Sequence, residues 1–331
     1  MTRRALVALL IALASAATAC AGTGQGASGG KDGQATGRVT LRVGDQKAGS
    51  QALLKAAGLL DGTSYAITWS QFTSGPPLLE AVNAGAVDIG GVGNTPPVFA
   101  AASGSKIKIV AAYRQSAKGS AILVPGGSAI TSPAQLKGKK IAVAKGSSAH
   151  YHLLAVLKKE GLTFKDIQPQ YLQPADALAA FSSGTVDAWA IWDPFASQAE
   201  IQHKARLVVD GAGLVNGLGF QVAAPAALDD AGRRTAIGDF LTRLGKARNW
   251  AATHLDEWAK VWARETGLPI EVADAAVANA VATPVVIDES VVSSEQEIAD
   301  AFTAEGLVPG TITFSQFVDD RFNDVVRKAQ Q

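Results

Sequence analysis

Four short stretches place hydroxyl, amide or carboxyl side chains where a helix is expected to begin. Ser74-Gly75-Pro76-Pro77 and Asn94-Thr95-Pro96-Pro97 set a capping residue before proline, which is favoured in the first helical turn. Gly146-Ser147-Ser148 offers hydroxyls without proline, and Asp193-Pro194 is a further capping pair. A helix N-terminus carries free N–H groups and the positive end of the helix dipole. If several converge, they predict an anion site that needs no buried arginine.

An internal repeat indicates that these helix starts lie on matching sides of two related halves. Val43 and Val143, each ten residues before a Leu-Leu pair, are about 100 residues apart. The pattern Gly-x-Val-Asp begins at Gly85 and returns at Gly184 with almost the same spacing. A single cap usually does no more than begin its own helix, but the repeat favours a shared site.

The order of elements predicts an α/β protein. Strand-like runs alternate with helical stretches from Val39 to about Ala224. Runs such as Asp88–Val92 and Ala188–Ile191 lack polar alternation, as parallel strands covered on both faces do. Ligands of such sheets bind at the carboxyl ends of the strands. The predicted architecture is therefore two α/β lobes joined by a two-segment hinge, with a cleft between them.

The hinge segments set the domain boundaries. They are expected near Val124-Pro125 and at Gly217–Gln221. Residues 38–124 and 219–331 then form lobe 1 with the C-terminal helices, and residues 125–218 form lobe 2.

The C-terminal part is predicted to be helical. Ser294-x-x-Glu297 resembles a capping box and predicts a helix that begins there. Trp250, Trp258 and Trp262 have helical spacing and are expected to pack in a core or between helices, not on a ligand.

The first residues predict export. Arg3-Arg4 precedes the uncharged apolar run Ala5–Ala14, and small residues follow up to Cys20. We interpret residues 1–20 as a lipoprotein signal peptide and Cys20, the only cysteine of the chain, as a lipid anchor. Residues 21–37 are rich in Gly, Ser and Ala and are predicted to form a flexible tether.

Composition argues against several functions. The formal net charge of +1 over 331 residues does not favour a nucleic-acid partner. The chain has no Gly-x-x-x-x-Gly-Lys-[Ser/Thr] loop, so energy for transport would come from a separate ATPase. We expect neither a metal nor a cofactor, because no useful ligand spacing occurs among the four histidines, His150, His152, His203 and His254.

An enzyme is the alternative from another class. Ser147, His150 and Asp193 are the residue types of a hydrolase. The Gly-x-Ser-x-Gly turn of such enzymes is absent around Ser147, so no catalytic residue is expected.

Four strings of the chain resemble the aliphatic-sulfonate-binding proteins of ABC importers. They are GDQKAGSQALL (Gly44–Leu54), GVGNTPPVFA (Gly91–Ala100), LKGKKIAVAKGSSAHYHLL (Leu136–Leu154) and VDAWAIWDPF (Val186–Phe195). The resemblance implies a type II periplasmic-binding fold and a monomeric, extracytoplasmic lipoprotein that delivers an organosulfonate to an ABC permease and its ATPase. The residues that match pocket motifs are Gln46, Gly75, Asn94, Thr95, Ser147, Ser148, His150, Trp192 and Asp193.

Roles for these residues follow from sulfonate chemistry. A sulfonate spreads one negative charge over three oxygens, which backbone amides and hydroxyls can satisfy. We expect Thr95, Ser147 and Ser148 at this group, with side-chain amides of Gln46 and Asn94 nearby. His150 would add a donor or make a local bond; Trp192 would line the tail, and Asp193 would cap its helix or bond a polar tail.

The ligand stays open at one position. Asn94 stands where sulfonate-binding relatives often have Asp, and proteins for taurine, nitrate or bicarbonate share the architecture. Binding of taurine, nitrate or another small anion is therefore the alternative within the same fold.

Overall fold

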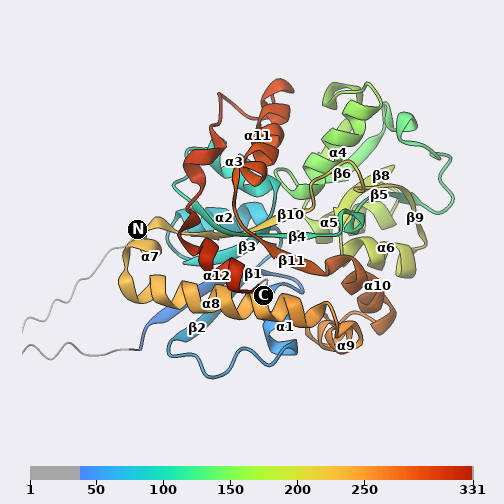
Figure 1. Cartoon of the computed structure of the whole chain (residues 1–331). Coiled ribbons are helices and arrows are strands. Elements are labelled where there is room, and N and C mark those ends of the chain that lie inside the picture. The colour runs from blue at the N-terminus through green and yellow to red at the C-terminus, as the bar shows by residue number, and fades with distance from the viewer. Residues whose placement is uncertain (1–37, 330–331) are drawn as a thin grey trace, which may run out of the picture. The chain divides into compact units, whose positions relative to one another are not determined.

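The computed structural model describes residues 38–329 (Figure 1). The signal peptide, Cys20 and the tether predicted for residues 1–37 lie outside this range. Within it, no helix combines the length and the apolar character that crossing a bilayer requires.

A six-stranded sheet forms the first lobe, in the order β11-β4-β10-β3-β1-β2. β1 pairs in parallel with β2 and β3, whereas β10 runs antiparallel to β3 and β4. The bounds are β1 Thr40–Gln46, β2 Ala66–Phe72, β3 Ile89–Gly93, β4 Lys108–Gln115, β10 Leu218–Ala223 and β11 Ala282–Val285.

A five-stranded sheet forms the second lobe, in the order β7-β6-β8-β5-β9. β6 pairs in parallel with β7 and β8, and β5 runs antiparallel to β8 and β9. The bounds are β5 Ser120–Pro125, β6 Lys140–Val143, β7 Gln168–Tyr171, β8 Ala188–Trp192 and β9 Ala205–Asp210.

The two sheets confirm the fold class and show how the repeat is used. Read from one edge, β2-β1-β3-β10-β4 matches β7-β6-β8-β5-β9 position for position. The fourth strand of each sheet is antiparallel and comes from the other half of the chain. Each half therefore gives its fifth strand to the partner lobe.

This exchange corrects one predicted boundary. The predicted boundary places residues 120–124 in lobe 1, but β5 (Ser120–Pro125) lies inside the second sheet. The chain thus crosses between lobes at residues 116–119, before β5, and returns at residues 211–217, close to the predicted second crossing. An apolar run predicts a buried strand without indicating which sheet will bury it.

Helices cover the sheets as the 3.6-residue periodicities predict. α4, α5 and α6 gather around the second sheet, and α8 runs along the first (Figure 1). The α-helices are α1 Ser50–Ala56, α2 Gly75–Asn83, α3 Thr95–Ala102, α4 Ser148–Lys159, α5 Pro174–Ser182, α6 Phe195–His203, α7 Pro225–Asp229, α8 Ala231–Ala251, α9 Leu255–Thr266, α10 Ile270–Ala280, α11 Glu289–Ala304 and α12 Asn323–Ala329. The 3₁₀ turns are η1 Ala117–Gly119, η2 Pro133–Leu136, η3 Phe164–Asp166, η4 Phe314–Phe317 and η5 Asp320–Phe322.

The C-terminal region differs from the prediction in two places. β11 interrupts the helices and pairs with β4 at the edge of the first sheet. The capping box predicted at Ser294 is wrong, because α11 begins at Glu289 and is capped by Asp288, whose side chain accepts a hydrogen bond from Val291 N. Ser294 lies inside this helix.

Candidate functional site

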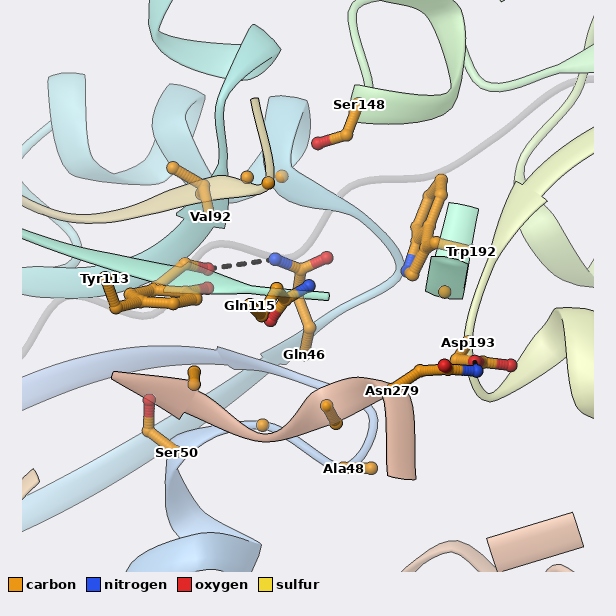
Figure 2. A pocket seen from close by; sticks show the side chains of 18 of the residues that line it. Gln46, Ala48, Ser50, Val92, Tyr113, Gln115, Ser148, Trp192, Asp193 and Asn279 are labelled. Carbon is orange, nitrogen blue, oxygen red and sulfur yellow. Dashed lines mark hydrogen bonds between the residues drawn. The ribbon is translucent and has the colours of Figure 1, made fainter. Parts of the chain in front are cut away.

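A cavity of about 210 Å³ lies between the two sheets and is lined by residues of both lobes (Figure 2). It sits at the carboxyl ends of β1, β3 and β8, as the open-sheet rule predicts. Of the predicted pocket residues, the ones that line it are Gln46, Gly75, Asn94, Ser147, Ser148, Trp192 and Asp193.

The N-terminus of α4 opens into this cavity. Ser147 is the capping residue, and its Oγ accepts a hydrogen bond from the backbone N–H of His150 at 3.4 Å. No proline occupies the first turn, so Ser148 and Ala149 each keep an N–H group that has no intrahelical acceptor. The Ser148 hydroxyl points toward the cavity (Figure 2). This helix end is therefore equipped to bind an anion.

The lobes are in close contact at the α4 end. A methyl group on Gly93, at the end of β3, would come within 1.9 Å of Ser148 Oγ. Gly93 thus allows the first lobe to reach Ser148. A second interlobe contact joins Gln173 of lobe 2, through its Oε1, to the hydroxyls of Thr73 and Ser74.

The N-terminus of α1 is occupied by the protein's own carboxylate. Asp45 is 2% exposed, and its two oxygens accept hydrogen bonds from Ser50 N and Gln51 N, each at 2.8 Å. Burial raises the pKa of Asp45 to about 6, although these hydrogen bonds act to lower it. This helix end is closed to an external anion.

The two helices that begin near a Pro-Pro pair offer fewer free N–H groups to an anion than the sequence predicts. Prolines 76, 77, 96 and 97 remove N–H groups from the first turns of α2 and α3. Gly75 lines the cavity but also packs against Pro96. Asn94 donates to Asn216 Oδ1 at 2.9 Å and accepts from Thr95 Oγ1 at 2.9 Å.

Two predicted ligand residues lie outside the cavity lining. Thr95 is fully buried, and its hydroxyl donates a hydrogen bond to Asn94 Oδ1. His150 is fully buried among Phe99, Phe164, Tyr171 and Phe302. Its Nδ1 accepts a hydrogen bond from Gly146 N at 3.2 Å, and burial lowers its pKa to about 3. His150 therefore makes a local hydrogen bond, because the first turn of α4 directs its side chain into the core and not into the cavity.

Trp192 and Asp193 border the cavity on the lobe 2 side (Figure 2). Asp193 Oδ1 accepts from the backbone N–H and the hydroxyl of Ser197, and Oδ2 accepts from Asn279 Nδ2 at 2.9 Å. Asp193 therefore caps α6 and ties it to α10; burial raises its pKa. On the opposite lobe, Gln46 Nε2 donates to Gly91 O at 2.9 Å.

The three residues that could form a hydrolase triad are engaged separately. Ser147 Oγ contacts a backbone N–H, the imidazole of His150 accepts from Gly146, and Asp193 bonds Ser197 and Asn279. These side chains do not form the nucleophile–base–acid chain of a hydrolase. Within residues 38–329, no group of three His, Cys, Asp or Glu side chains is placed to hold a metal ion.

Several cavity residues were missed by sequence reasoning. Arg248 lines the cavity, although the sequence analysis assigned no arginine to the site. Trp258 and Trp262 are core residues as predicted, yet they also line the cavity. Their helical spacing indicated a shared face but not what that face would meet. The cavity is also lined by Tyr113, Gln221 and Asn279, which lie in no motif that would distinguish them in the sequence.

Two α/β lobes with an exchanged strand and a ligand-sized cavity between them define a solute-binding protein of the type II periplasmic-binding fold. Comparison with known proteins agrees. Residues 74–214 match the family described as NMT1/THI5 like. The solved structure of the alkanesulfonate-binding protein from Xanthomonas axonopodis pv. citri, bound to MOPS, superposes with a TM-score of 0.76 at 37% identity, covering 86% of this chain and 99% of that one.

Curated relatives define the family more closely. A putative aliphatic sulfonates-binding protein of Escherichia coli K12 is 37% identical over 280 residues, 83% of this chain and 87% of its own length. A protein of the same name from Bacillus subtilis 168 is 31% identical over 288 residues, which are 85% of this chain and 86% of its own length. The chain belongs to the aliphatic-sulfonate-binding protein family.

Proposed function

We propose that this protein captures an alkanesulfonate in the interlobe cavity and delivers it to an ABC importer for sulfur acquisition. The observation that carries the proposal is the open N-terminus of α4, where Ser147 and Ser148 border a cavity shared by both lobes. The names of the family's relatives support the choice of sulfonate over other small anions.

The α4 end suits the chemistry of a sulfonate. Three oxygens share one charge, and the free N–H groups of Ser148 and Ala149 with two hydroxyls supply donors on one side. Gln46 and Asn94 approach from the first lobe. Both lobes thus complete the shell around the anion.

The arrangement of the lobes supports capture by closure. The crossings at residues 116–119 and 211–217 are the segments about which the lobes would swing. The contacts of Gln173 with Thr73 and Ser74, and of Asp193 with Asn279, would form as the cleft closes. The closed form would then be recognised by the permease, whose ATPase drives transport.

The proposal includes location and state. The protein would act outside the cytoplasmic membrane as a monomer, held there by a lipid on Cys20, and would catalyse no reaction. Mass spectrometry of the membrane fraction, with a Cys20→Ser variant as control, tests the anchor.

Isothermal titration calorimetry tests the ligand, with ethanesulfonate, taurine, nitrate, sulfate and bicarbonate as titrants. We expect ethanesulfonate to bind. The double variant Ser147→Ala/Ser148→Ala should weaken this binding by about 2 kcal/mol or more, which is about thirtyfold, since both hydroxyls would bond a charged group.

Ser132→Ala is the matched control, because Ser132 also caps a helical turn but lies outside the cavity lining. It should leave the affinity for ethanesulfonate unchanged. Binding of nitrate or bicarbonate with no response to any sulfonate would reject the assignment.

A further inference from the structure

Three buried side chains of the first lobe line the cavity with polar atoms that have no hydrogen-bond partner. Among residues 38–329, neither amide atom of Gln221 is bonded, nor is the indole Nε1 of Trp258 or Trp262. All three residues are at most 4% exposed and line the cavity. Buried indole N–H groups normally find a partner, so three unsatisfied residues around one hollow indicate a ligand group that satisfies them.

Arg248 adds a positive charge to the part of the cavity lining that the first lobe supplies. Its guanidinium lies 3.5 Å from the centre of the Tyr113 ring, stacked on it. Tyr113 faces Gly219 across the sheet, where a methyl group would come within 2.3 Å of the ring, so a glycine is needed to seat this pair.

The charge of Arg248 has no direct counterpart. Within the described part of the chain it forms no salt bridge. Asp45 acts on Arg248 electrostatically, but both of its oxygens already accept N–H groups of α1. Burial lowers the pKa of Arg248, as expected for a cation that lacks full compensation.

These donors are separate from the α4 end. They come from β4, β10, α8 and α9, all in or attached to the first lobe, whereas Ser147 and Ser148 belong to the second. Figure 2 shows Tyr113 and Ser148 at different places around the cavity. A ligand whose sulfonate binds at α4 would therefore extend its tail toward these donors of the first lobe.

We infer that Arg248, Trp258, Trp262 and Gln221 form a second subsite, which binds an anionic oxygen group at the far end of the sulfonate ligand. The inference rests on the proposed function and names the preferred substrate class as sulfonates that carry a second acidic group. The group bound there would be a carboxylate or a second sulfonate, because the subsite offers a guanidinium and N–H donors.

Calorimetry tests this subsite with three ligands in which the same three-carbon chain joins the sulfonate to a hydrogen, a carboxylate or a second sulfonate: propane-1-sulfonate, 4-sulfobutanoate and propane-1,3-disulfonate. In the wild-type protein we expect at least one of the two bifunctional ligands to bind about tenfold or more tightly than propane-1-sulfonate. Because the spacing is the same, the ratio between the affinities for 4-sulfobutanoate and for the disulfonate identifies which acidic group the subsite prefers.

Arg248→Met should remove most of this advantage, because methionine keeps the packing on Tyr113 but not the charge. Trp262→Phe should reduce it less, since one N–H donor is lost. Lys246→Met, an exposed position on the same helix, is the control and should keep the wild-type ratio. Thermal unfolding of each variant verifies that the fold is intact.

Each contrary result has a distinct meaning. Equal or weaker binding of both bifunctional ligands in the wild type would overturn the second subsite and leave the sulfonate function intact. Equal losses for all three ligands in Arg248→Met would also overturn it, because Arg248 would then hold the sulfonate itself. If no sulfonate binds at all, the proposed function fails and the subsite with it.

Discussion

Helices α1 and α4 are repeat-related, but their N-terminal ends differ. α1 is closed by Asp45, whose oxygens accept two N–H groups of its first turn. α4 has Lys145 at the position that the repeat pairs with Asp45, and its first turn carries no carboxylate. The same supersecondary unit thus produces a self-satisfied helix end in one lobe and an open one in the other.

The comparison shows what a repeat can and cannot supply. Duplication places two helix ends at one cleft, but the side chain before each helix decides whether the end is free. Had both halves kept an aspartate, the cleft would contain two occupied ends and would repel an anion. The asymmetry supports the proposal that the anion binds at the helix end of lobe 2.

The largest expected effect comes from closing α4 in the manner of α1. Ser147→Asp would place a carboxylate at the open helix end and weaken ethanesulfonate binding by about 100-fold or more. The reason is that like charges about 4 Å apart repel by about 4 kcal/mol at an effective dielectric constant of about 20. Calorimetry measures the loss.

Ser147→Asn is the matched neutral variant, since asparagine also caps helices. It should retain most of the affinity that Ser147→Asp loses. Equal losses in the two variants would mean that shape, and not charge, matters at this position, and would remove the electrostatic difference between the two helix ends.

A smaller effect concerns stability and pH. Burial holds the pKa of His150 at about 3, below its value in the unfolded chain. The unfolded state therefore binds the proton more readily, and stability present above about pH 6.5 is lost as the pH falls toward 3, by up to about 1.4 kcal/mol per unit. Denaturant titrations of the wild type and His150→Asn should show a shallower acid loss in the variant.

The same pair of proteins checks the position of His150. Because the imidazole lies outside the cavity lining, the affinity for ethanesulfonate should depend on pH equally in both. An affinity that rises below pH 6 in the wild type alone would return His150 to the binding site.

The smallest effect is expected at Thr95. Thr95→Val removes a hydrogen bond to Asn94 Oδ1 in a buried place, which should cost about 1 kcal/mol of unfolding free energy. The affinity for ethanesulfonate should change by no more than about twofold. A larger loss, with stability preserved, would show that the Thr95 hydroxyl reaches the ligand after all.

Local patterns predicted much of the fold. The recurrence of Val43 and Gly85 as Val143 and Gly184 identified two similar α/β units, and the sheets match position for position. The pattern could not show that β5 and β10 change places. Both are short apolar strands, and either sheet would bury them equally well.

The candidate site divides in the same way. Loops after strands were predictable, because strand ends and helix caps have sequence signals, and seven of nine chosen residues line the cavity. Thr95 and His150 are polar like the neighbouring residues that line the cavity, but their positions in the first helical turn direct their side chains into the core. Trp258 and Trp262 needed the packing of α9 against α1 to reach the cavity.

Residue order alone specified what depends on near neighbours: strands, helix starts, the repeat and therefore two lobes with a cleft. The folded molecule alone determined which lobe holds each exchanged strand and that Arg248 reaches the cavity. The physical reason is range. Caps and periodicities act over a few residues, as in the bonds of Asp45 to Ser50 N and Gln51 N, whereas Tyr113, Gly219 and Arg248 are brought together from distant parts of the chain.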